Sequence, residues 1–218
     1  MRAIYLFLIV FAANILGWSQ GAAQAVQGQH DVVMGSGELP PGWEVRLDRP
    51  TDNLTDLQFV IEGGGYHITT NAPAGIFYKP ADELNGLYNV RAEFTQLQKS
   101  QHPEAYGLFI GGNHLQSDNQ RYIYFLVRQD GKYLIKERDG DKTETIVDWK
   151  ADPAVNAADS SGKTANLLDI AVDMDMVRFL VNGRQVNSIE KSKLPDTNGV
   201  TGLRINHHLD VLVEGFKT

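Results

Sequence analysis

The sequence predicts an all-β protein, built as an antiparallel jelly-roll β-sandwich. Strand-like runs follow one another at short spacing, turn residues separate most of them, and no segment after the apolar N-terminus has the pattern of a long helix. The clearest runs lie between Tyr106 and Gly140, where a strand, a glycine-rich loop and two longer strands follow in order. We expect this segment to form the centre of a sheet.

A hairpin is the best-defined element in this segment. Tyr122 to Gln129 is almost entirely apolar or aromatic and rich in residue types that fit a pleated surface. Asp130-Gly131 supplies the positive φ angles of a tight turn, and Lys132 to Arg138 returns as the partner strand. Asp139-Gly140 predicts a second turn directly after it.

The two faces of the first hairpin strand differ, because side chains alternate between faces. Ile123, Phe125 and Val127 form a row suited to the core between two sheets. The opposite row consists of Tyr122, Tyr124, Leu126 and Arg128. Amphipathic aromatic side chains that end in a cation suit a face that is only partly dry. We therefore expect one side of this sheet to be open to water.

The remaining strands are expected at regular intervals along the chain. Their predicted ranges are 43–48, 57–62, 66–70, 75–78, 88–97, 143–149, 166–173, 177–182, 184–189, 200–206 and 209–216. Residues 153–162 look irregular or briefly helical, and residues 26–41, rich in Gly, Gln and small side chains, look like a flexible leader. One domain over residues 42–218 accounts for these elements.

The first 25 residues have the layout of a secretory signal peptide. Met1-Arg2 gives a basic start, residues 3–18 are apolar apart from Asn14, and Ala23-Gln24-Ala25 provides an Ala-x-Ala cleavage site. We expect cleavage after Ala25 and export, with the mature protein secreted or periplasmic. The alternative is an uncleaved anchor, for which the apolar run is slightly short.

Composition narrows the function classes further. The chain of 218 residues contains no cysteine, which excludes disulfides, thiol catalysis and thiolate metal sites. Its net charge of −7 argues against nucleic acids and, once the signal peptide is removed, against anionic membranes as partners. Neutral ligands remain compatible with this charge, and the oligomeric state is left open.

Several motifs together resemble a known superfamily. They are Gly63-Gly64-Gly65, Tyr88-x-Val90-x-Ala92-x-Phe94, Gly107-Leu108-Phe109-x-Gly111-Gly112, Tyr122-x-Tyr124-Phe125-x-Val127-Arg128-x-Asp130-Gly131, Trp149, Asn166-Leu167 with Ile170 and Val172, Val181-Asn182-Gly183-x-x-Val186, and Gly202-Leu203-Arg204. Over residues 43–216 the chain resembles the concanavalin A-like lectin/glucanase superfamily, in its laminin-G-like and 3-keto-disaccharide hydrolase-like exported bacterial branches. The resemblance implies a jelly-roll scaffold rather than one activity.

Two departures from that superfamily argue against an enzyme. Family 16 glucanases carry a Glu-x-Asp-x-x-Glu strand that holds two carboxyl groups close together, and this motif is absent here. The nearest runs, Asp169 to Asp175 and Asp210 to Glu214, suit a solvated outer face. The keto-disaccharide branch usually has a Leu-Phe-(Asn/Asp)-Gly-Lys segment near its first Trp, and residues 43–48 replace it.

The aromatic face of the hairpin is the main candidate for a ligand site. Sugars are held by aromatic rings and by polar side chains in a preformed groove. The candidate ligand-binding residues are Tyr122, Tyr124, Arg128, Arg91, Glu93 and Trp149. The alternative is that the tyrosines pack under a loop and complete the core.

The sequence thus predicts an exported, non-catalytic carbohydrate-binding or surface-recognition module that binds an oligosaccharide or polysaccharide. A glycoside or keto-sugar hydrolase or lyase that uses Glu93 or Glu137 as acid or base is the second hypothesis. A structural protein-interaction domain is the third. No cofactor and no metal are expected: adjacent residues on a strand, such as His207 and His208 would be, point to opposite faces, and only a turn with distant carboxylates would let them bind one metal ion. Calcium at Asp139-Gly140-Asp141 is left open, although a hairpin turn explains that segment.

Overall fold

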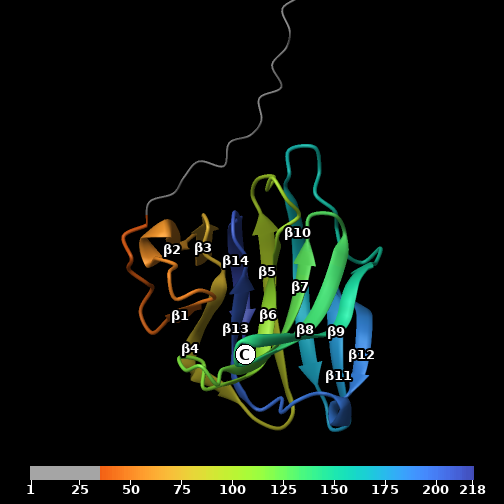
Figure 1. Cartoon of the computed structure of the whole chain (residues 1–218). Coiled ribbons are helices and arrows are strands. Elements are labelled where there is room, and N and C mark those ends of the chain that lie inside the picture. Colours follow the sequence, from red (N-terminus) through yellow and green to blue (C-terminus); the bar gives the residue numbers. More distant parts are fainter. Residues whose placement is uncertain (1–34) are drawn as a thin grey trace, which may run out of the picture.

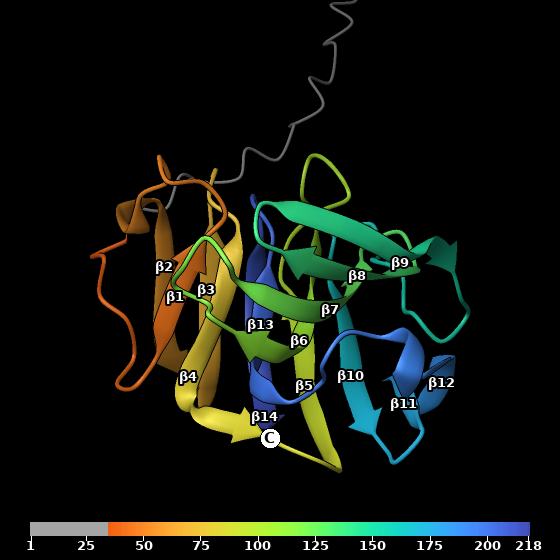
Figure 2. The same cartoon turned by 60° about the horizontal axis from the view of Figure 1, so that its bottom comes forward.

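A computed structural model describes residues 35–218, and they form two antiparallel sheets of seven strands each that lie face to face (Figures 1 and 2). Sheet A has the order β1-β4-β13-β6-β7-β8-β9 and sheet B the order β12-β11-β10-β5-β14-β3-β2. The strands are β1 Glu44–Leu47, β2 Leu57–Glu62, β3 Gly65–Thr70, β4 Gly75–Leu84, β5 Tyr88–Gln96, β6 Ala105–Asn113, β7 Arg121–Arg128, β8 Lys132–Asp139, β9 Lys142–Ala151, β10 Thr164–Val172, β11 Met176–Val181, β12 Arg184–Glu190, β13 Gly199–Ile205 and β14 Asp210–Lys217.

The fold is the predicted jelly-roll sandwich, because the chain crosses repeatedly from one sheet to the other. β4 belongs to sheet A, β5 to sheet B and β6 to sheet A again, and β13 and β14 lie in different sheets. Two 3-10 turns, Leu54–Asp56 and Lys191–Lys193, are the helical elements of the described residues. In this part of the chain no helix is long and apolar enough to cross a membrane.

The core lies between the sheets and takes one row of side chains from each strand. The predicted inward row is confirmed: Ile123, Phe125 and Val127 are fully buried in this core. Phe125 contacts Phe179 of sheet B edge-on, with ring centroids 5.3 Å apart. Each fully buried side chain of this size stabilises the fold by roughly 1.5–3 kcal/mol. A chain without cysteine depends on this core.

The predicted hairpin is also confirmed in its register. β7 pairs with β8 without a shift, from Arg121 opposite Asp139 to Arg128 opposite Lys132, and Gly131 adopts a φ of 76° in the turn. The second predicted turn joins β8 to β9, with Gly140 at a φ of 61°. β6 and β13 carry bulges where they pair, so this sheet is less regular on the other side of β7.

The signal peptide predicted for residues 1–25 lies outside the described residues. Of the predicted leader, residues 35–41 are described, and they are attached to the sandwich. The Gly35 N–H donates to the Thr55 carbonyl at 2.8 Å, and Leu39 packs against the core. Residues 153–162, expected to be irregular or briefly helical, contain turns and no helix.

Candidate functional site

The site lies on the outer face of sheet A, meaning the face turned away from sheet B. Strand pairing aligns side chains across this face in rows. One row runs from Glu44 through Tyr78, Gly202, Phe109 and Tyr124 to Lys136. The next contains Arg46, Ile76, Arg204, Leu126 and Leu134. Residues from six strands therefore converge on one surface.

Aromatic rings form the floor of this face. Phe109 contacts Tyr122 with centroids 5.3 Å apart, and Tyr122 contacts Tyr124 at 5.6 Å. Gly202 is required between Tyr78 and Phe109, since a Cβ atom there would lie 2.6 Å from the Phe109 ring. We call this cluster the aromatic floor; its members are Tyr78, Phe109, Tyr122 and Tyr124, and it packs with Leu115, Leu126 and Leu134.

The expectation that the tyrosines lie on a half-wet face is wrong. Tyr122 is 2% exposed and Tyr124 8% exposed. Burial raises the pKa of Tyr122, and it raises that of Tyr124 to about 12. Neither ring offers an open surface for stacking, so the alternative interpretation, burial under other groups, describes these two residues better.

A buried ion pair covers part of the aromatic floor. Arg204 of β13 binds Asp48, which follows β1, through two hydrogen bonds of 2.5 Å from Nη1 and Nη2. The guanidinium carbon lies 5.8 Å from the centre of the Tyr124 ring, at cation–π distance. Burial alone would raise the pKa of Asp48, but the charge and hydrogen bonds of Arg204 outweigh it and lower this pKa. Asp48 therefore stays ionised.

The loop between β6 and β7 covers another part of the aromatic floor. Leu115 enters the aromatic cluster, and Gln116 donates from Nε2 to the Tyr78 hydroxyl at 2.7 Å and to the Val45 carbonyl at 3.2 Å. Arg46 donates to the carbonyl oxygens of Leu115 and Ser117. The loop is thus held against β1 and β4 at one edge of the face.

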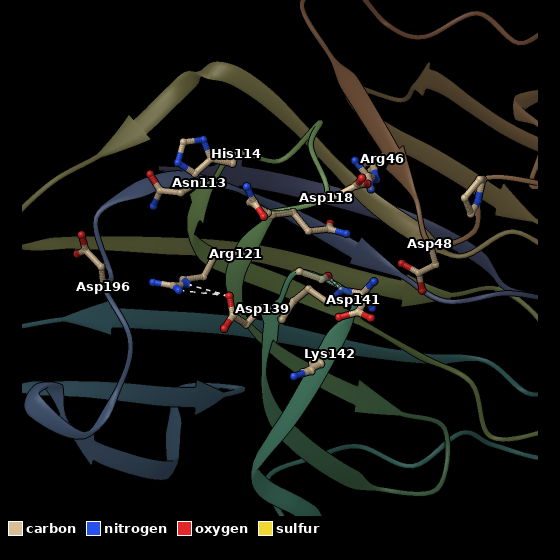
Figure 3. Close-up of a pocket in the computed structure, with 15 residues that line it drawn as sticks. Arg46, Asp48, Asn113, His114, Asp118, Arg121, Asp139, Asp141, Lys142 and Asp196 are labelled. Atoms are coloured by element: carbon tan, nitrogen blue, oxygen red, sulfur yellow. Dashed lines mark hydrogen bonds and ion pairs between the residues drawn. The ribbon is translucent and has the colours of Figure 1, made fainter.

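Between these covers a groove with a volume of about 960 Å³ remains. Figure 3 shows it running from Asp196, Asn113 and His114 at one end to Arg46 and Asp48 at the other. The β8–β9 turn forms one wall, and the Gly140 N–H donates to the Gln120 carbonyl at 2.8 Å. The lining residues are Arg46, Asp48, Pro50, Asn113, His114, Asp118, Asn119, Gln120, Arg121, Arg138, Asp139, Gly140, Asp141, Lys142 and Asp196.

The lining of this groove is polar almost throughout. Apart from Pro50 and Gly140, every residue in it carries a hydrogen-bonding or charged side chain. The volume lies in the range of sites that hold small ligands, about 300–1,000 Å³. Such a groove suits a ligand that is itself rich in hydrogen-bonding groups.

The inner end of the groove concentrates positive charge. Besides burial, four charged groups act on the pKa of Tyr122, and they are Arg204, Asp48, Arg138 and Arg46. Arg46 and Arg138 line the groove with Asp48, and Arg204 binds Asp48 above the aromatic floor. Behind the ion pair a smaller cavity of about 100 Å³ is lined by Arg204 and Asn206, whose Nε and Oδ1 atoms are buried without a hydrogen-bond partner among the described residues.

Two predicted site residues, Arg128 and Trp149, lie together at the other end of sheet A. The Arg128 guanidinium lies 4.2 Å from the centre of the Trp149 ring and binds Asp130 through two hydrogen bonds. Neither residue lines the groove. Trp149 is half-buried beside the aromatic cluster, so the face bears a second aromatic feature separate from the groove.

The predicted grouping of Arg91 and Glu93 with the tyrosines is wrong. Both residues lie on β5, which the jelly-roll crossover places in sheet B. Arg91 binds Asp169 there. Glu93 lies opposite Glu214 of the neighbouring strand β14, on the outer face of that sheet. The thickness of the core separates them from the groove.

Glu137, proposed as an acid or base, is also outside the groove. It lies opposite Ile123, a member of the inward row, so its side chain projects to the inner side of sheet A near the sheet edge. Burial raises its pKa, and the nearby Asp139 and Glu144 raise it further. Glu93 and Glu137 belong to different sheets, and neither lines the groove.

The metal candidates can be placed as well. His207 and His208 lie in the loop between β13 and β14 and not on a strand, so they do not point to opposite faces: their rings contact each other. His207 pairs with Glu104 at 3.0 Å. Asp139 and Asp141 flank the β8–β9 turn, as the hairpin interpretation predicts. Within residues 35–218 no group of three or more His, Asp or Glu side chains is arranged to hold a metal ion.

Sequence reasoning missed Arg46, Asp48, Arg138 and Arg204 as site residues. The alternation of β8 already placed Arg138 on the same face as Tyr122, which is its direct partner. Asp48 and Arg204 are separated by 156 positions, and no local pattern links them. The sequence did give one signal: Arg204 is a charged residue within the mostly apolar run of β13.

No protein-family model matches the sequence, and no curated protein is similar enough to count as a relative. Solved structures do match. The carbohydrate-binding module CBM66 from Bacillus subtilis is 10% identical with a TM-score of 0.58, over 84% of this chain and 94% of that one. A glycoside hydrolase family 16 endo-glucanase from Bacteroides ovatus is 9% identical with a TM-score of 0.57, over 80% and 93%. Alginate lyase A1-II′ is 13% identical with a TM-score of 0.54, over 81% and 93%.

At these identities the likeness shows the fold. The chain has the concanavalin A-like jelly-roll fold that the sequence resemblance implied.

Proposed function

We propose that this protein is an exported, non-catalytic module that binds a glycan in the groove of sheet A. The observation that carries the proposal is the groove itself, a preformed, polar channel of about 960 Å³ on the outer face of one sheet. A sugar presents hydroxyl groups that both donate and accept hydrogen bonds, and the amide, carboxylate and guanidinium groups of this lining match both roles. Fold neighbours named as a carbohydrate-binding module and as glycan-active enzymes support a carbohydrate ligand.

The mode of binding differs from the one that the sequence suggested. The tyrosine rings are buried, so hydrogen bonds to the groove walls would hold the sugar, without stacking on Tyr122 or Tyr124. The two tyrosines act as a rigid floor that supports Arg204 and Asp48. A preformed site of this kind loses little conformational entropy on binding.

Binding without catalysis is favoured by the state of Asp48. Hydrolysis of a glycosidic bond needs a carboxylic acid whose pKa is raised, to protonate the leaving oxygen. Asp48, the half-buried carboxylate at the inner end of the groove, has a lowered pKa and both oxygens bound to Arg204. It is a poor general acid, and Glu93 and Glu137 lie elsewhere.

The protein-interaction hypothesis has less support. Among residues 35–218 the exposed large apolar side chains are Val60, Ile61, Leu87 and Met174, and they belong to one edge strand and two separate turns. Large contiguous apolar patches on a protein surface mark many protein-interaction sites. The described surface offers no such patch.

A pair of matched substitutions tests the proposal. Asn119 is exposed and lines the groove, whereas Asn89 is exposed on the outer face of sheet B. We expect the purified protein to bind at least one oligosaccharide class on a glycan array, Asn119→Trp to lose that binding by filling the groove, and Asn89→Trp to retain it. Absence of binding to every glycan, or equal loss in both variants, would overturn the proposal. Release of shortened sugars would instead favour the hydrolase or lyase hypothesis.

A further inference from the structure

The inner end of the groove carries more positive than negative charge. Arg46 and Arg138 line the groove together with the half-buried carboxylate of Asp48, and Arg204 binds that carboxylate. Arg204 uses both of its terminal nitrogens on that carboxylate, which leaves the other two guanidinium groups without a buried counter-charge. This local excess stands out in a chain whose net charge is −7.

Arg138 is the guanidinium group with the most nitrogens left to bind a ligand. Its Nε donates to the Gly140 carbonyl at 2.7 Å, which orients the guanidinium toward the groove. Among residues 35–218 Arg138 forms no ion pair. A guanidinium held at one nitrogen in this way keeps its two terminal nitrogens free for a planar, two-oxygen acceptor.

Arg46 is held in a similar manner. Its Nη1 donates to two carbonyl oxygens of the β6–β7 loop, at 3.4 Å and 3.2 Å. Asp118 is 3.9 Å from Nη2, but its side chain is fully exposed. Water screens that contact, so Asp118 neutralises Arg46 only weakly.

The other carboxylates lie at the rim. Asp118, Asp139, Asp141 and Asp196 are all exposed, and Asp139 is paired with Arg121. Charges at an exposed rim interact through a high dielectric, whereas those at the half-buried inner end interact more strongly. A single anionic group at the inner end is therefore favoured, while a chain of anionic units along the groove would meet the rim carboxylates.

We propose that the groove selects a glycan that carries an isolated anionic group, a carboxylate or a sulfate ester, which Arg138 and Arg46 bind at the inner end. The Asp48–Arg204 pair positions this end by fixing the surface against which the sugar ring rests. The inference rests on the proposed glycan-binding function and narrows its ligand class.

The test compares matched acidic and neutral oligosaccharides by calorimetry. The probes are oligoglucuronate, oligogalacturonate and oligomannuronate fragments, mixed oligosaccharides with one uronate or one sulfated sugar, and the carboxyl-reduced or desulfated form of each. We expect a probe with one anionic sugar to bind at least about tenfold more tightly than its neutral form, as a charge-assisted bidentate contact predicts. The uronate and sulfate arms separate the two sources of negative charge.

Two glutamine variants assign the effect to a residue. Arg138→Gln should remove the difference in affinity between the anionic probe and its neutral form. Arg121→Gln is the matched control, because it lines the same groove at the exposed rim and is already paired with Asp139. Thermal unfolding of both variants shows that the fold is retained.

The outcomes separate this inference from the proposed function. Equal affinity for anionic and neutral forms would overturn the inference and leave glycan binding intact. Tighter binding of a fully anionic oligomer than of a singly charged one would contradict the role of the rim carboxylates. No binding to any probe or array glycan would overturn both. A preference that persists in Arg138→Gln and disappears in Arg121→Gln would also refute the assignment.

Discussion

The outer faces of the two sheets hold their charged side chains in different ways. On sheet A the Asp48–Arg204 pair lies over aromatic rings, and the Arg204 side chain is 10% exposed. On sheet B the Arg91–Asp169 pair has no aromatic ring of the described residues over it, and the Arg91 side chain is 49% exposed although that of Asp169 is 8% exposed. His67, which binds Asp210 and Glu62 on the same sheet, is 22% exposed. Burial of a charged pair costs desolvation energy that only good geometry offsets. On sheet A this desolvation energy is spent beside the groove, which Asp48 lines. We infer that the Asp48–Arg204 pair shapes the site.

Removal of one partner of the buried pair should give the largest effect. Arg204→Met leaves Asp48 beside the aromatic floor without the guanidinium that binds both of its oxygens, and such changes in buried pairs cost about 3–5 kcal/mol. We expect the free energy of unfolding to fall by that amount at neutral pH, as measured by urea denaturation. The double substitution Asp48→Leu with Arg204→Met should recover most of it. A loss below about 1 kcal/mol in the single variant would mean that water reaches the pair.

The corresponding change on sheet B should cost less. Arg91→Met leaves Asp169 with a buried oxygen, Oδ1, that already has no partner among the described residues, but water can replace the exposed guanidinium. We expect a loss of about 1–3 kcal/mol, the usual cost of an unsatisfied polar group. Equal losses for Arg91→Met and Arg204→Met would remove the contrast between the faces.

The fold was largely predictable because its evidence is local. Alternation in β7, the Asp-Gly turn at residue 130 and the spacing of the strands all act over a few residues, and each prediction agrees with the structure. The site was less predictable because no local sequence pattern shows which of the two sheets a strand joins. The crossovers of the jelly roll place β5 and β7 in different sheets, which separates Arg91 from Tyr122.

Burial was the second quantity that the sequence could not supply. A tyrosine row that ends in an arginine fits a half-wet face and a covered one equally well. What covers Tyr122 and Tyr124 is set by Arg204, Asp48 and the β6–β7 loop, all distant in sequence from β7. The choice between the two interpretations therefore required the tertiary structure.

The two faces should also differ in how their stability depends on pH. Burial alone would lower the pKa of His67, but its hydrogen bonds to Asp210 at 2.6 Å and Glu62 at 2.7 Å outweigh burial and raise it. The protonated form is thus favoured in the fold. Its contribution is complete below about pH 6.5, the unfolded value, and is lost as the pH rises through the higher folded pKa.

His67→Gln is expected to remove this dependence. The difference in unfolding free energy between parent and variant should be larger at pH 6 than at pH 9, by less than about 1 kcal/mol because Glu62 is exposed. The pH dependence that Asp48 gives to stability has the opposite sign, because its pKa is lowered in the fold. Its contribution to the unfolding free energy is present above about pH 3.8 and is lost as the pH falls through the folded pKa. A parent–variant difference that grows toward pH 9 would contradict the assignment to His67.

The smallest effect is expected at the far end of sheet A, where Arg128 lies over Trp149. A cation–π contact at a partly exposed position is worth about 0.5–1 kcal/mol, so Trp149→Leu should lower the free energy of unfolding by no more than that. Because Trp149 does not line the groove, the affinity for a bound glycan should change by less than about twofold. A larger loss of affinity would show that the ligand extends from the groove across the aromatic cluster to this end. In that case the whole outer face of sheet A, and not the groove alone, would be the binding surface, and the contrast with sheet B would widen accordingly.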